Sequence, residues 1–103
     1  MNAGIKSNQH GAKMEVDQKL LEKALRSEGF LHTYVWQDGP YAFYSDHMHP
    51  VETAHIILDG EMTLTQGNQT KTYHAGERCD VPAGATHAAK MGLHGCKYLV
   101  GEK

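Results

Sequence analysis

Turn-forming residues recur at intervals of about eight to twelve positions after Gly29, and this rhythm constrains the fold more than any other feature. The segments between these turns are rich in aromatic and β-branched residues, which favour strands. The rhythm therefore predicts an all-β chain of about eight short strands, closed into a barrel of two sheets. The predicted turns lie at residues 37–40, 59–60, 67–68, 82–84 and 92–95.

A single helix is predicted before the strands, at about residues 15–28. Its apolar residues recur at intervals of three and four, which places them on one face that would pack on the sheet. Gly29 is a suitable residue to end the helix. Residues 1–13 are small and polar, and we predict a flexible N-terminal arm. Residues 14–103 then form one domain, with the barrel at about residues 30–101.

Composition excludes several classes of function. A formal net charge of −2 and dispersed basic residues argue against a nucleic-acid or membrane surface. No apolar stretch approaches the ~20 residues that a membrane-spanning helix requires. The N-terminus lacks the apolar centre of a signal peptide, so we expect a cytoplasmic protein. Cys79 and Cys96 are too few for a disulfide framework and are predicted to be free thiols.

Histidines are the residues that indicate chemistry. Of the eight histidines, His47, His49 and His55 lie close together, and His87 follows the turn at residues 82–84. Side chains alternate faces along a strand, so an extended segment would place His47, His49, Thr53 and His55 on one face. His87 would have to meet them inside the barrel. Imidazoles on neighbouring strands are suitable ligands for a transition metal.

Two motifs in this region resemble those of the cupin superfamily. His47, His49 and Gly60 fit the first cupin motif, and Gly76, Pro82, Gly84 and His87 fit the second. The chain is similar to a small single-domain cupin over roughly residues 39–100. The resemblance implies a jelly-roll barrel of antiparallel strands with one N-terminal helix. It also implies one divalent transition metal, Fe, Zn, Ni or Mn, held by the two histidines of the first motif and the one of the second.

The sequence departs from the cupin pattern at three positions. Tyr41 stands where the first motif begins with glycine, Thr53 replaces its metal-binding glutamate, and Met91 replaces the final asparagine of the second motif. Three substitutes for the missing carboxylate remain open. They are His55, which we prefer because it shares the inward face, Glu52, which would need a bulge to turn inward, and a water molecule. The predicted metal ligands are His47, His49, His55 and His87.

Two classes of function are compatible with a metal site, and the departures at Thr53 and Met91 also leave open a metal-free barrel that has lost its ligands. The first is a metal-dependent enzyme of the oxygenase or isomerase type that acts on a small polar molecule. The second is a non-catalytic module that binds a small ligand or a metal. No residue is assigned a catalytic role from the sequence. The resemblance further implies a homodimer, because small cupins commonly pair and a barrel of this size gains stability from a partner.

Overall fold

The computed structural model describes residues 17–103. The arm predicted at residues 1–13 and the first part of the predicted helix lie outside this range. The described helix, α2 (Gln18–Ser27), falls within the predicted limits. No helix in residues 17–103 is long and apolar enough to cross a membrane.

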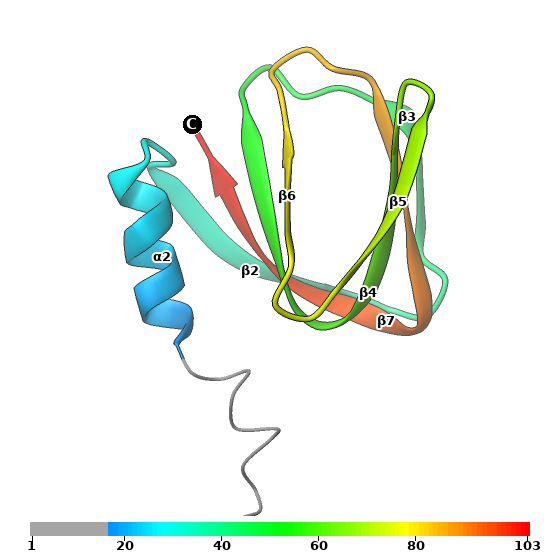
Figure 1. Ribbon diagram of the computed structural model, residues 1–103, viewed down its shortest axis with the longest axis horizontal. Coiled ribbons are helices and arrows are strands. Elements are labelled where there is room, and N and C mark those ends of the chain that lie inside the picture. The colour runs from blue at the N-terminus through cyan, green and yellow to red at the C-terminus, as the bar shows by residue number, and fades with distance from the viewer. Residues whose placement is uncertain (1–16) are drawn as a thin grey trace, which may run out of the picture.

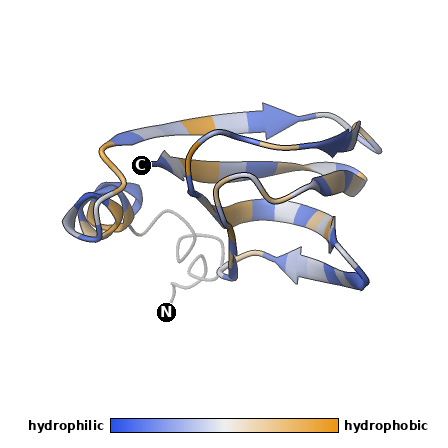
Figure 2. Cartoon of the chain, turned by 90° about the horizontal axis from the view of Figure 1, so that it is seen from above, coloured by the Kyte–Doolittle hydropathy of each residue, from blue (hydrophilic) through white to orange (hydrophobic). Residues whose placement is uncertain are grey.

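The helix is fixed to the barrel by its last turn. Leu25 is fully buried, and Phe30, just beyond the helix, is 1% exposed. Gly29 adopts a positive φ of 103°, which lets the chain reverse so that the Phe30 amide donates to the Leu25 carbonyl at 3.0 Å. Gly29 therefore ends the helix as predicted. Figure 2, seen from above, shows the helix outside the layers of strands.

Six strands follow the helix and form one hydrogen-bonded sheet, which folds over into two layers, called the two sheets below. Two of the strands, β4 and β7, are long enough to run through both layers (Figure 1). The second half of β7 pairs with β2 and with the first half of β4, which also pairs with β6. The first half of β7 pairs with β3 and with the second half of β4, which also pairs with β5. All pairs are antiparallel. The strands are β2 (His32–Asp38), β3 (Phe43–His47), β4 (Thr53–Gln66), β5 (Gln69–His74), β6 (Arg78–Val81) and β7 (His87–Glu102).

The described residues contain six strands instead of about eight because two predicted turns are bends within long strands. β4 runs through residues 59–60, and β7 runs through residues 92–95. Gly60 and Gly95 have positive φ values of 83° and 77°, and the β4–β7 register shifts around Gly60. These glycines bend both strands at the corner of the barrel, which is a common use of bulges. A bend and a turn require the same residue types, so the sequence did not separate them.

The bend in β4 also changes which residues face inward. Before it, Ala54 and Ile56 pack on the outside beneath α2, with Leu25 and Phe30. Ile57 belongs to the inner cluster, and after the bend so do Met62 and Leu64. The inward positions are thus odd-numbered before the bulge and even-numbered after it. This change keeps one continuous core between the two sheets.

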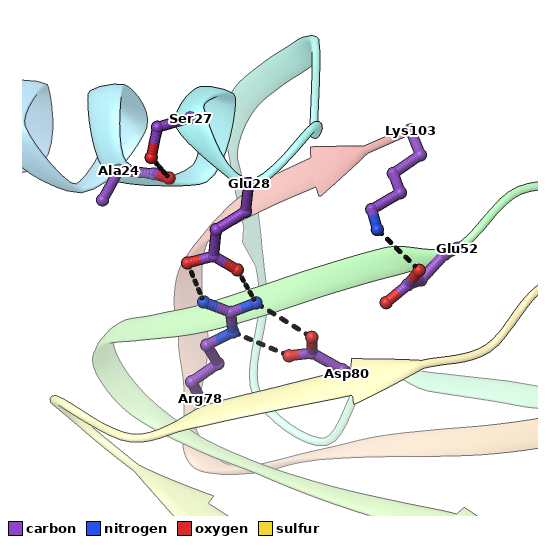
Figure 3. Close-up of polar contacts among 7 residues, drawn as sticks. All are labelled: Ala24, Ser27, Glu28, Glu52, Arg78, Asp80 and Lys103. Atoms are coloured by element: carbon purple, nitrogen blue, oxygen red, sulfur yellow. Dashed lines mark hydrogen bonds and ion pairs between the residues drawn. The ribbon is translucent and has the colours of Figure 1, made fainter.

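Arg78 on β6 ties the end of the helix to the barrel (Figure 3). Its guanidinium donates to both carboxylate oxygens of Glu28, at 3.0 and 2.8 Å, and to Asp80, at 2.7 and 2.9 Å. The guanidinium also lies over the ring of Phe30, 5.6 Å from its centroid. Arg78 therefore covers the most buried aromatic ring of the outer cluster.

We expect Arg78→Ala to lower the melting temperature by about 5 °C, because the ring of Phe30 loses one of the two cationic side chains that lie over it and two carboxylates lose their partner. Thermal unfolding followed by circular dichroism measures the change. Arg26→Ala is the matched control, since the contacts of Arg26, with Glu22 at 3.9 Å and with Oγ1 of Thr33 at 3.2 Å, are both exposed. Equal melting temperatures for the two variants would contradict the proposed role of Arg78.

Candidate metal centre

His47 and His87 are brought together by strand pairing. They are direct partners in the β3–β7 register, where the last residue of one strand faces the first residue of the other. The register shifts between Tyr44 and His47, and this irregularity precedes the histidine. The two imidazole centroids are 4.2 Å apart. His87 is 3% exposed, whereas His47 is half-buried.

His49 joins them from the loop that follows β3. The amide of Gly84 donates to the His49 carbonyl at 2.9 Å, so the turn at residues 82–84 holds the loop in place. The His49 ring lies 5.0 Å from that of His47 and 4.9 Å from that of His87, centroid to centroid. One ligand atom from each of the three histidines lies within 4.8 Å of the others. In Figure 1 the loops before β4 and before β7 lie at the same end of the barrel.

Backbone carbonyls orient two of these imidazoles. Nδ1 of His47 lies 2.7 Å from the Ser45 carbonyl, and Nδ1 of His87 lies 3.1 Å from the Ala85 carbonyl. A carbonyl oxygen only accepts, so each Nδ1 carries the proton and donates it. The Nε2 atoms are then left with free lone pairs, as in protein metal sites whose ligating histidines are held by a second hydrogen bond. The donor set fits a divalent transition metal.

A cavity of about 360 Å³ opens beside the three imidazoles. Its volume is within the range of small-molecule sites. Tyrosine, tryptophan, methionine and aliphatic side chains form most of its wall. None of the described residues that line it is lysine or arginine. A negatively charged ligand would therefore find its positive partner in a bound metal and not in a side chain.

The other candidate ligands lie in different places. His55 and Thr53 line the same cavity, but His55 is outside the group of three convergent histidines. Glu52 is not among the lining residues, and its carboxylate pairs with Lys103 at 3.0 Å (Figure 3). The expectation that His47, His49, Thr53 and His55 share one extended strand is wrong, because residues 48–52 form a loop between β3 and β4. All four nevertheless line the cavity.

Burial keeps two of the cavity histidines neutral. The pKa of His49 is lowered by burial first, and then by the neighbouring imidazoles of His87 and His47. Burial lowers the pKa of His55 further, to about 4, with smaller contributions from His49 and His87. Neutral imidazoles are the form that binds a metal. Nδ1 of His55 is also buried without a hydrogen-bond partner among the described residues.

We expect His55 to make the metal-free protein sensitive to acid. The pKa of His55 is about 4 in the folded protein and near 6.5 in the unfolded one. Its contribution to the free energy of unfolding is therefore complete above pH 6.5 and is lost as the pH falls towards 4. The loss at pH 4 is about 3 kcal/mol. Urea unfolding at pH 7 and pH 4, with a chelator present, should show this extra loss in the parent and not in His55→Gln. Equal losses of unfolding free energy in the two proteins would contradict the role of His55 in acid sensitivity.

A second polar cluster, in which Trp36, Tyr44 and Tyr98 of the cavity wall meet Asp38 outside the lining, was missed by sequence reasoning. Asp38 accepts hydrogen bonds from the hydroxyls of Tyr44 and Tyr98, each at 2.7 Å, and from the Trp36 indole at 3.0 Å. Burial, and then the bond to Asp38, raise the pKa of Tyr98, so its hydroxyl stays protonated. The proton of each tyrosine points to Asp38, which leaves the hydroxyl oxygens able to accept. These residues come from β2, β3 and β7, and only the fold brings them together.

The two cysteines do not take part in the site. Cys79 and Cys96 are both free and buried in the inner core. Burial is the main factor that raises the pKa of each thiol to about 12. Both are therefore unreactive thiols at neutral pH, and the prediction of free thiols is confirmed.

Comparison with known proteins identifies the family of this barrel. A model of the cupin domain matches residues 35–92, which is more than half of the chain. The chain belongs to the cupin family. The match contains β3, β4 and the start of β7, and with them all three convergent histidines of the cupin site. No curated protein matches the sequence.

Solved structures share this fold. The DMSP lyase DddQ of Ruegeria pomeroyi is 26% identical, with a TM-score of 0.64 over 69% of this chain and 36% of that one. A cupin-2 domain protein of Shewanella frigidimarina is 22% identical, with a TM-score of 0.58 over 66% and 65% of the two chains. Oxalate decarboxylase of Bacillus subtilis, which has Mn(II) centres, is 16% identical, with a TM-score of 0.64 over 69% and 20%. The chain thus spans less than two thirds of each of these proteins.

Proposed function

We propose that this cupin is a metal-dependent enzyme in which His47, His49 and His87 hold one divalent transition metal. The proposed substrate is a small polar molecule that binds the metal through oxygen, in a reaction of the oxygenase or isomerase type. The observation that carries the proposal is the convergence of three imidazoles, two of them oriented by backbone carbonyls, on one wall of a cavity. Three protein ligands leave coordination positions for water or substrate.

Different residues of the chain would have different roles in such a site. A bound metal supplies a Lewis acid that polarises a substrate oxygen or acidifies a water molecule. The apolar wall excludes water from the rest of the cavity, which strengthens the polar contacts inside it. Asp38 fixes the hydroxyls of Tyr44 and Tyr98, so that their oxygens accept a hydrogen bond from a donor on the substrate. His55 remains neutral and is proposed as a polar wall of the cavity and not as a fourth ligand.

Two similar structures support catalysis over simple binding. DddQ is a lyase and oxalate decarboxylase is a decarboxylase, and both share this fold. Their own substrates are not transferred to this chain, because it spans only 36% and 20% of their lengths. The shared feature that supports the proposal is a cupin barrel in an enzyme, together with the Mn(II) centres of the decarboxylase.

Cobalt substitution tests the proposal. The protein loaded with Co²⁺ should show a visible spectrum that changes when oxalate is added, because oxalate would occupy the open coordination positions. His55→Gln should give the same spectrum as the parent, since His55 is not proposed as a ligand. Bound cobalt whose spectrum ignores oxalate would indicate a closed site and favour a non-catalytic metal-binding module. Failure to bind cobalt would refute the proposal.

We also propose that the protein is a homodimer that pairs through β2. Within residues 17–103 this strand has a hydrogen-bonded neighbour on one side only, and it carries the half-exposed Trp36. A free edge strand with aromatic side chains is a favourable surface for strand pairing. Sedimentation velocity at micromolar concentration is expected to give the mass of a dimer, and a monomer would refute this arrangement.

A further inference from the structure

Thr53 and Glu102 are direct partners across the β4–β7 ladder. Cross-strand partners share a face of the sheet, with Cβ atoms about 5 Å apart. Both residues line the cavity that contains the three histidines. Thr53 occupies the position at which the cupin motif has its glutamate. The carboxylate that this position lacks is therefore matched by that of Glu102 on the adjacent strand.

Glu102 is the one carboxylate among the described residues that line the cavity. The hydroxyl of Tyr34 donates to its Oε2 at 3.1 Å, which holds the side chain in place. Among residues 17–103 no other hydrogen bond to this carboxylate is found, so Oε1 is available to a ligand. The negative charge of Glu102 is close enough to His49 to oppose the lowering of its pKa. It is not, however, part of the convergent ligand cluster.

Thr53 provides an independent observation. The residue is 1% exposed, and its Oγ1 is buried without a hydrogen-bond partner among the described residues. An unpartnered buried hydroxyl is costly, so such atoms in a cavity usually meet a ligand or an ordered water. The Thr53 hydroxyl can donate a hydrogen bond and the neighbouring Glu102 carboxylate can accept one, so together they offer a ligand one donor and one acceptor.

We propose that Thr53 and Glu102 form a subsite that recognises the hydroxyl of a small hydroxy acid. This inference rests on the proposed function, in which the carboxylate of the ligand binds the metal. A hydroxyl group both donates and accepts, so it satisfies Glu102 and Thr53 together. An ammonium group has donors only, so it leaves the hydroxyl proton of Thr53 without an acceptor on the ligand. A ligand with neither a hydroxyl nor an ammonium group leaves both Thr53 and Glu102 unpaired. The subsite therefore selects a hydroxy acid over an amino acid and over an unsubstituted acid.

Three acids of similar size test the subsite on the zinc-loaded protein. Competition calorimetry with glycolate, glycine and acetate should rank glycolate as the tightest ligand of the parent. Glu102→Gln should weaken glycolate about tenfold relative to acetate, since a hydrogen bond to a charged group is lost. Thr53→Val should weaken glycolate about fivefold by the same measure. Glu52→Gln is the matched control, because Glu52 pairs with Lys103 and does not line the cavity.

The metal-free protein gives a second readout for Thr53. Thr53→Val removes a buried hydroxyl that has no partner, so its melting temperature should rise by about 5 °C above that of the parent. A lower melting temperature would show that the hydroxyl is satisfied within the fold and would overturn its role.

The remaining outcomes also separate the two proposals. Glycine binding as tightly as glycolate, or an unchanged ratio of glycolate to acetate in Glu102→Gln, would overturn the subsite while leaving the metal centre intact. A parent protein that binds no zinc would overturn the proposed function and the subsite with it. A loss of zinc in Glu102→Gln alone would make Glu102 a metal ligand and would likewise overturn the subsite.

Discussion

Replacing His87 with alanine is expected to weaken zinc binding by at least about 100-fold. Removing a residue that only supports a metal ligand already costs 10- to 100-fold in affinity, and His87 is itself one of the three convergent ligands. It is also the most buried of the three, so no other side chain from solvent can replace it. Competition with a chromogenic chelator measures the affinity, and elemental analysis of the purified protein measures the stoichiometry.

The control for this result is His94→Ala. His94 lies on β7 like His87, but it is exposed and does not line the cavity. The His94→Ala protein should bind zinc with the affinity of the parent. Circular dichroism must show that His87→Ala is folded, since it removes a buried side chain. Parental affinity in a folded His87→Ala protein would refute the three-histidine site.

Substituting Gly60 with alanine is expected to destabilise the fold by about 3 kcal/mol, which lowers the melting temperature by roughly 10–25 °C. Gly60 has a positive φ of 83°, which an alanine adopts only at a cost. An added Cβ would also overlap the carbonyl oxygen of Gly95 and lie 3.0 Å from Cα of Cys96. Both contacts are with backbone on the facing strand, so the clash is relieved only by separating β4 from β7.

Gly67→Ala separates these two causes. Gly67 also has a positive φ, 58°, but nothing lies within 4 Å of a Cβ added there. Gly67→Ala should therefore lower the free energy of unfolding only by the cost of a positive φ for alanine, about 1 kcal/mol. Urea unfolding of both variants measures the difference. Equal losses would show that the close approach at the barrel corner contributes nothing.

The fold was predictable to the extent that it depends on local residue types. Strand-forming segments, the helix and its end at Gly29 are short-range properties, and they were correctly predicted. The bends at Gly60 and Gly95 were predicted as turns, because glycine serves both and only the facing strand distinguishes them. Tyr41 is informative in this respect: it replaces the glycine of the cupin motif, yet it keeps a positive φ of 57°.

The candidate site was predictable where a motif fixes the spacing. His47, His49 and His87 were found because the motif gives their positions, and the structure brings them together. Asp38 and Glu102 were missed because their importance depends on strand register. Nothing in the sequence near Glu102 shows that it faces Thr53, which lies almost half the chain away. The expectation that His47 and His55 share one strand was wrong, because it assumed an unbroken strand through Pro50.

The two long strands that belong to both sheets have a consequence for cooperativity. β7 begins at His87 and ends at Glu102, and it is paired with β4 over most of that length. Neither sheet can open without breaking part of this shared ladder. A metal held at one end should therefore slow hydrogen exchange at amides along the whole of β4 and β7 by a similar factor. Metal occupancy would then set the frequency of unfolding for the entire barrel, and not only for the loop that carries His49.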